Sequence, residues 1–197
     1  MEIFKNEKII KNILAAWCVV FFILGGSRAA ADERGAATLA PRLGVEAGID
    51  LSNLYGDAAR DMFGSRLGIA GGAFLNLPLG AFAALQPEIL YEQKGGRFNG
   101  SFYQLDYVEI PVLLNITFGT PAFNPGLLLG PAFGDIVASQ GVPKTIDHFD
   151  LGLVAGIQVN FSAVFVSGRY EMGVMELSAD QKVKNSLVTF LVGLSYI

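Results

Sequence analysis

Most of the chain alternates between apolar residues and small or polar ones, and this period of two constrains the fold more than any other feature. In residues 43–52, which read LGVEAGIDLS, the aliphatic side chains fall on one face and the glycines and carboxylates fall on the other. The pattern recurs in residues 149–161 and 188–196. Successive side chains of a β-strand point to opposite faces, whereas a helix repeats about every 3.6 residues. The alternation therefore predicts an all-β protein.

The same pattern, followed along the chain, predicts eight strands. Several of them exceed the roughly 5–6 residues usual in soluble sheets and reach the about 9–11 residues that a tilted membrane strand needs. Only 16% of the 197 residues are charged, against about 25% in an ordinary soluble domain, which agrees with a membrane protein. The predicted strands cover residues 43–52, 66–77, 81–93, 102–118, 124–134, 148–159, 162–173 and 185–197.

The connections between the predicted strands alternate in length. Outer-membrane barrels of the up-and-down type have an even number of strands, short periplasmic turns and longer extracellular loops. The sequence therefore predicts an eight-stranded antiparallel up-and-down transmembrane β-barrel with both ends on the periplasmic side. A soluble lipocalin-like barrel is the alternative. Short turns are expected at 78–80, 119–123 and 160–161, and long loops at 53–65, 94–101, 135–147 and 174–184.

Residues 1–31 are predicted to be a secretory signal peptide. Three lysines precede an apolar run of about 12 residues, and residues 29–31 are all alanine, as at a cleavage site. A membrane-spanning helix needs roughly 20 apolar residues, so the run is too short for one. Cys18, the single cysteine, lies in this segment, and its removal leaves a chain without cysteine, as suits an oxidising compartment. Residues 32–42 are predicted to be a periplasmic leader and 43–197 the outer-membrane β-barrel.

The aliphatic face of the predicted strands is expected to contact lipid. A soluble barrel would carry many charges on its outer surface, but no lysine is expected at the centre of any strand. The opposite face consists of glycine, alanine, serine, asparagine and a few carboxylates, which suits a narrow interior. The fourth predicted strand shows the aliphatic face most clearly, with Val108, Ile110, Val112, Leu114, Ile116 and Phe118.

With the aliphatic faces outward, eight charged residues are predicted to point into the barrel. Arg169 is then almost the only interior cation, and it is expected to bridge at least one carboxylate because an unpaired buried charge is costly. We interpret the group as a polar plug that fixes the strand register, with a gate or a narrow cation-preferring conduit as the alternative. The predicted polar cluster of the barrel interior contains Glu46, Asp50, Glu88, Glu92, Glu109, Asp150, Arg169 and Glu171.

No catalytic, cofactor-binding or metal-binding motif is found in the sequence, so no enzyme, cofactor or metal site is expected. The single histidine, His148, excludes a metal site built on paired histidines. It lies close to Asp147 and Asp150, and a barrel-rim lipid-modifying enzyme is therefore one hypothesis, although a polar loop end is the simpler interpretation. The net charge of −4 gives no case for nucleic-acid binding.

Three short segments carry a resemblance to a known family: QPE at 86–88, EIP at 109–111 and GRY at 168–170. Over residues 42–197 the chain resembles the PorT-like outer-membrane β-barrel family, which is common in Bacteroidetes-type bacteria. The resemblance implies an eight-stranded outer-membrane barrel and says little about activity. Some relatives serve a protein secretion system, so an accessory role in such a system is a further alternative.

Together these features predict a small integral outer-membrane β-barrel with a structural or interaction role through long extracellular loops. A narrow channel is the alternative within the same fold. The expected partners are outer-membrane lipid, the barrel-assembly machinery during insertion and a protein bound by the outer loops. Barrels of this kind usually end on an aromatic residue, whereas Tyr196 is penultimate here; insertion is still expected.

Overall fold

The structure is a computed structural model. It describes residues 40–56, 63–98, 101–120, 123–141, 148–175 and 183–196, which belong to one compact unit, Ala37–Ile197. The predicted signal peptide and most of the predicted leader lie outside the described residues. Among the described residues, no helix is long and apolar enough to cross a membrane.

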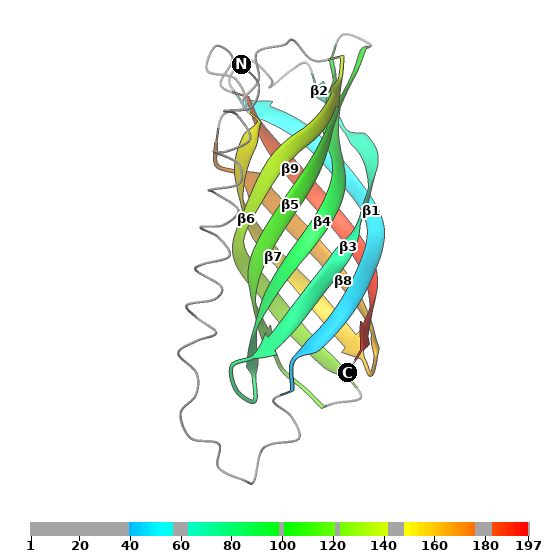
Figure 1. Ribbon diagram of the computed structural model, residues 1–197. Coiled ribbons are helices and arrows are strands. Elements are labelled where there is room, and N and C mark those ends of the chain that lie inside the picture. The colour runs from blue at the N-terminus through cyan, green and yellow to red at the C-terminus, as the bar shows by residue number, and fades with distance from the viewer. Residues whose placement is uncertain are drawn as a thin grey trace. The chain divides into compact units, whose positions relative to one another are not determined.

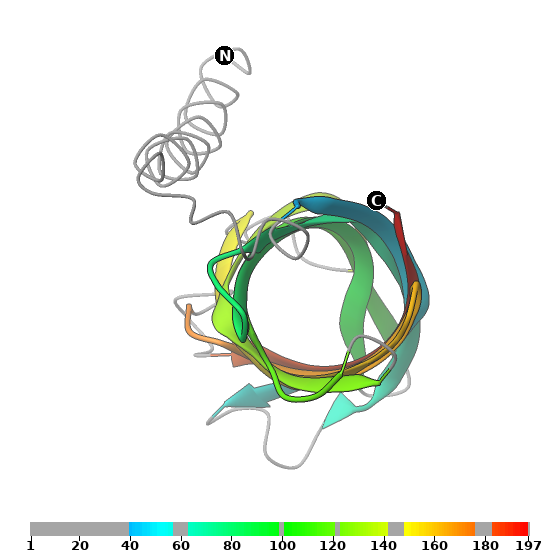
Figure 2. The ribbon, with the colours of Figure 1, turned by 90° about the horizontal axis from the view of Figure 1, so that it is seen from below.

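Eight long antiparallel strands close into a barrel, and the closed ring is visible along its axis in Figure 2. Each long strand pairs with the next, and β9 closes the barrel against β1 in a register that runs from Leu43↔Tyr196 to Gly56↔Val183. The predicted fold is thereby confirmed. The strands of Figure 1 are β1 (Arg42–Gly56), β3 (Arg66–Pro78), β4 (Ala83–Phe98), β5 (Ser101–Thr117), β6 (Asn124–Gln140), β7 (Phe149–Phe161), β8 (Val164–Gly173) and β9 (Val183–Tyr196), with a two-residue strand β2 (Phe63–Gly64) beside the end of β4.

The short connections all lie at the end of the barrel where β1 begins and β9 ends. They join β3 to β4, β5 to β6 and β7 to β8 through residues 79–82, 118–123 and 162–163. The last of these turns lies two residues later than the predicted 160–161. Ser162 sits at its first position with a φ of 57°, a conformation that tight hairpin turns require.

At the opposite end the strands run farther than the sequence predicted. The prediction of a long loop at 94–101 is wrong. β4 and β5 continue to pair from Lys94↔Leu105 to Phe98↔Ser101 and leave only residues 99–100 between them. Glycine and polar residues in this stretch had suggested a loop. They belong to a backbone ladder that continues past the apolar part of the strands, and Gly95 adopts a φ of 141° that side-chain-bearing residues rarely reach.

The apolar side chains point outward, as expected from the alternation. Large apolar residues are exposed on every long strand, and on β1 they occupy alternate positions that are interrupted only by the exposed alanine Ala47. On β4 the outward series ends at Tyr91, after which the outward position is Gln93. A continuous apolar outer surface of this kind is the face that a membrane barrel turns to lipid. On β1 the exposed series contains Leu43, Val45, Ile49 and Leu51.

The lumen near the short turns is filled by aromatic rings. Phe74 from β3 and Phe165 from β8 meet edge to face, with ring centroids 5.2 Å apart and an interplanar angle of 80°. A Cβ at Gly44 would overlap the Phe74 ring, and one at Gly193 would overlap the Phe165 ring. The inward glycines therefore make room for large side chains from other strands, which accounts for part of the glycine excess of the chain.

Candidate functional site

All eight charged residues named from the sequence are buried in the lumen, where none is more than 6% exposed. They come from β1, β4, β5, β7 and β8. Five of the carboxylates gather around two buried cations, Arg169 and Lys94. We call these groups the arginine cluster (Arg169, Glu46 and Glu88) and the lysine cluster (Lys94, Glu92, Glu109 and Glu171).

The arginine cluster links three strands across the lumen. Arg169 on β8 donates through Nη1 to Glu88 Oε2 on β4 at 2.5 Å, and through Nη2 to Glu46 Oε2 on β1 at 3.1 Å. Gln86 extends the cluster toward the short turns, because its Nε2 donates to Glu88 Oε1 at 2.8 Å and its Oε1 accepts from Asn115 at 2.9 Å. The guanidinium thus bridges two carboxylates, whereas the sequence predicted a bridge to at least one.

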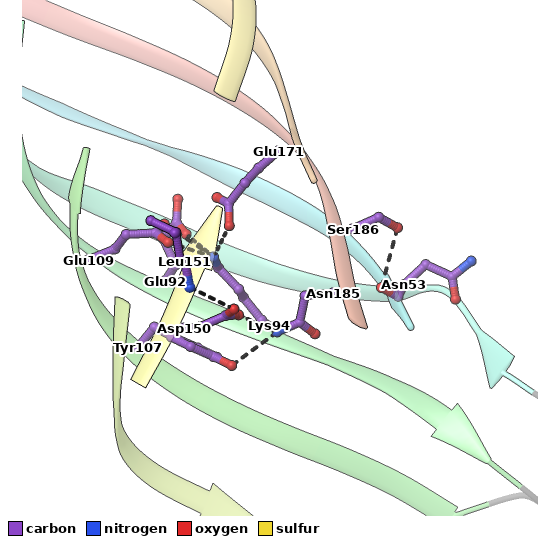
Figure 3. Close-up of polar contacts among 10 residues, drawn as sticks. All are labelled: Asn53, Glu92, Lys94, Tyr107, Glu109, Asp150, Leu151, Glu171, Asn185 and Ser186. Carbon is purple, nitrogen blue, oxygen red and sulfur yellow. Dashed lines mark hydrogen bonds and ion pairs between the residues drawn. The ribbon is translucent and has the colours of Figure 1, made fainter. Parts of the chain in front are cut away.

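The lysine cluster surrounds a single ammonium group (Figure 3). Lys94 Nζ lies 3.3 Å from Glu92 Oε2, 3.0 Å from Glu109 Oε1 and 2.8 Å from Glu171 Oε1. The same Nζ is 4.8 Å from the centre of the Tyr107 ring, a distance at which the ring face attracts a cation. The side chain of Lys94 is fully buried, so the whole cluster is shielded from solvent.

Lys94 is the residue that sequence reasoning missed. The expectations that Lys94 lies in a loop and that Arg169 is almost the only interior cation are both wrong. The signal was present in the alternation, since Glu88, Glu92 and Lys94 all occupy even positions of one strand and must share a face. The glycines that follow Lys94 suggested that the strand had already ended.

Three carboxylates of the lysine cluster lie close enough together to resemble a metal site. Oxygens of Glu92, Glu109 and Glu171 are all within 4.8 Å of one another. Each of these carboxylates is also in contact with Lys94 Nζ, however. The ammonium therefore occupies the position that a metal ion would take, and it supplies the positive charge that brings the three carboxylates together.

The two remaining residues of the predicted cluster lie in different surroundings. Asp150 accepts from the backbone N–H of Leu151 at 2.9 Å and from Asn185 Nδ2 at 3.0 Å (Figure 3). Asp50 is fully buried, and neither of its oxygens has a partner with normal hydrogen-bond geometry among the described residues. It faces Thr189 in the register of β1 and β9.

Little free space remains between the two clusters. A cavity of about 10 Å³ lies there, lined by Arg169, Thr189 and three carboxylates of the lysine cluster, together with Leu90, Pro111 and Val154. A volume of this size holds roughly one water molecule. Side chains therefore close the lumen at the level of the clusters.

The side chain of Glu171 fits beside Gly152 only because that residue lacks a Cβ. A Cβ at Gly152 would lie 2.6 Å from Glu171 Oε1, and no backbone atom is among its nearest neighbours. We expect Gly152→Ala to push Glu171 away from Lys94 and to destabilise the barrel by about 1–3 kcal/mol. The measurement is the temperature at which the folded band disappears on unboiled gels, which should be lower than in the wild type.

The matched control is Gly168→Ala on the outer face of β8. A Cβ there would meet nothing closer than the Phe190 ring at 3.5 Å, an ordinary van der Waals contact. Its effect should stay within about 0.5 kcal/mol. Equal transitions for the two alanine variants would show that the space beside Gly152 is not tightly packed.

His148 lies directly before β7, at a position for which the sequence suggests either a rim enzyme or a loop end. Its Nδ1 donates to the backbone carbonyl of Ile136 on β6 at 3.0 Å. This contact holds His148 against the neighbouring strand β6. Asp147 lies outside the described residues.

The comparison with known protein families agrees with the fold. A model of the outer membrane protein beta-barrel domain matches residues 31–179. No curated protein sequence matches the chain.

Similar solved structures include the attachment invasion locus protein Ail of Yersinia pestis, which is 17% identical and matches over 79% of this chain and 98% of that chain with a TM-score of 0.45. Neisserial surface protein A is 14% identical over 78% of this chain and 97% of that chain, with a TM-score of 0.47. The N-terminal β-barrel domain of Pseudomonas aeruginosa OprF is 15% identical over 78% and 97%, with a TM-score of 0.40.

Proposed function

The chain belongs to the outer membrane protein β-barrel domain family, and on this premise we propose that it is a closed, non-enzymatic barrel whose role is structural or is carried by its extracellular loops. It is a small eight-stranded β-barrel of the outer membrane. The finer assignment to PorT-like barrels rests on the three segments at 86–88, 109–111 and 168–170, and it is part of the proposal.

The observation that carries the proposal is the set of ion pairs that cross the lumen. Arg169 on β8 reaches Glu46 on β1 and Glu88 on β4, and Lys94 on β4 reaches Glu171 on β8. These strands are not neighbours in the barrel, so the contacts exist only because side chains meet in the middle of the lumen. A lumen occupied in this way supports a plug rather than an open pore, as expected for eight strands.

The end of the barrel opposite the short turns supports an interaction role. There β4 and β5 pair as far as Phe98↔Ser101, and β6 continues to Gln140 beyond its last pairing with β7 at Asp135↔Phe149. Strands that continue beyond the apolar outer surface would extend the barrel past the lipid. We propose that the outer loops, carried on this extension, bind a protein partner, while lipid surrounds the barrel and the barrel-assembly machinery inserts it.

Conductance in planar bilayers tests the closed-barrel proposal. We expect the purified folded protein to give no steady single-channel currents, because the two ion clusters obstruct the lumen. A porin with an aqueous channel, added to the same membrane, serves as the control for detection. Reproducible open channels from the folded protein would favour the narrow-channel alternative instead.

A further inference from the structure

In each cluster two buried carboxyl groups converge on one cation. Glu46 and Glu88 share the guanidinium of Arg169, and oxygens of Glu92 and Glu109 lie within 4.8 Å of each other around Lys94; we call these the two carboxyl pairs. An ionised carboxylate has acceptors only, so two carboxyl groups form a hydrogen bond only when one of them carries a proton. A proton held between the two groups of a pair would let them form such a bond.

One oxygen of each pair is left without a hydrogen bond from any described donor. These oxygens are Glu46 Oε1 and Glu92 Oε2, and both are buried. Lys94 Nζ is 3.3 Å from Glu92 Oε2, but this contact lacks hydrogen-bond geometry. Buried polar atoms are rarely left without a partner, so each oxygen marks a position where a proton completes the network.

The charge of the two clusters leads to the same conclusion. The arginine cluster sets one guanidinium against two carboxyl groups, and the lysine cluster sets one ammonium against three. An unneutralised carboxylate is costly to bury, because it loses its hydration and gains no counter-charge. One proton in each pair makes the arginine cluster neutral and leaves the lysine cluster with a single negative charge.

We propose that the lumen is a proton-binding site in which, at neutral pH, one proton is shared between Glu46 and Glu88 and a second is shared between Glu92 and Glu109. This inference does not depend on whether the loops bind a partner. The charged and titratable groups that face the clusters are Glu46 and Asp50 on β1, Arg66 on β3, Glu88, Glu92 and Lys94 on β4, Tyr107 and Glu109 on β5, Asp150 on β7, and Arg169 and Glu171 on β8; the described parts of β6 and β9 add no buried charged residue.

Bound protons make the stability of the barrel depend on pH. A glutamate of the unfolded chain is ionised above about pH 4.3, so folding at neutral pH takes up both protons. The folded state then binds more protons than the unfolded state, and stability falls as pH rises above that value until the pairs lose their protons. Each bound proton changes the unfolding equilibrium constant about tenfold per pH unit, and two protons change it about a hundredfold.

Infrared spectroscopy of the folded barrel in lipid tests the proposal directly. Protonated carboxyl groups give a C=O stretching band that moves in D₂O, and we expect this band at pH 7. Glu46→Gln and Glu92→Gln should each reduce this band, because each removes one of the two carboxyl groups that share a proton. Asp150→Asn is the matched control and should leave the band unchanged, since Asp150 accepts from Leu151 and Asn185 and pairs with no carboxyl group.

A second measurement keeps the proposal testable if a glutamine variant fails to fold. Tryptophan fluorescence is unsuitable for the mature barrel, because the only tryptophan, Trp17, lies in the predicted signal peptide. Denaturant unfolding is therefore followed by gel mobility or circular dichroism. Between pH 6 and pH 8 the wild type should lose stability with a steepness of at least about two protons. Absence of the carboxyl band in the wild type, or stability that does not change over this range, would overturn the proposal.

Discussion

Lys94→Met will lower the free energy of unfolding by about 3–5 kcal/mol, because it leaves three buried carboxyl groups around a position that has lost its cation. Lys94 Nζ contacts Glu92, Glu109 and Glu171 within 3.3 Å, and its side chain is fully buried. Methionine keeps most of the volume and removes the charge, so the loss reports on electrostatics rather than on a cavity. The measurement is the temperature at which the folded band disappears on unboiled gels.

Two further variants separate this effect from a general loss of lysine. Lys184→Met, at a partly exposed position of β9, should leave the transition nearly unchanged. Lys94→Met combined with Glu109→Gln should recover part of the stability, because it also removes one of the stranded negative charges. If Lys94→Met and Lys184→Met melt alike, the ammonium does not hold the lysine cluster together.

Arg169→Ala will have an effect of similar size, about 3–5 kcal/mol, because Glu46 and Glu88 lose the guanidinium that pairs with both. These carboxylates lie on β1 and β4, so the substitution also removes the contact that links three strands at this level of the lumen. The folded band should convert at a clearly lower temperature than that of the wild type.

Arg42→Ala is the control for this second prediction. Arg42 is exposed at the start of β1, where loss of a surface charge should change stability by no more than about 0.5 kcal/mol. An Arg169→Ala barrel with an unchanged heat transition would contradict the interpretation of the charged lumen as a plug.

The strands could be predicted because their signal is local. Alternation depends only on neighbouring residues, so β3 and β7 were placed to within about two residues at each end, and the direction of each interior charge followed from its position in the strand. At the ends away from the short turns, β1, β4 and β6 were predicted too short. Polar outward residues such as Gln93 on β4 and Asp135 on β6 interrupt the apolar series there, while the backbone ladder continues.

The pairing of the interior charges could not be predicted in the same way. Arg169 meets Glu46 and Glu88 across separations of 123 and 81 residues, and Lys94 meets Glu171 across 77. Which charges share a level depends on the tilt and stagger of the whole barrel, which no single strand specifies. The sequence reasoning therefore found the carboxylates and one cation, but it did not divide them into two clusters.

The central claim is that the lumen is closed by contacts made across it, and a double-mutant cycle between Lys94→Met and Glu171→Gln tests it most directly. These residues lie on β4 and β8, which are not adjacent, and their side chains are 2.8 Å apart in the middle of the lumen. We expect a coupling free energy of about 1–3 kcal/mol from unfolding of the two single variants and the double variant. A coupling of zero within error would mean that the two side chains do not meet, and it would contradict the closed lumen.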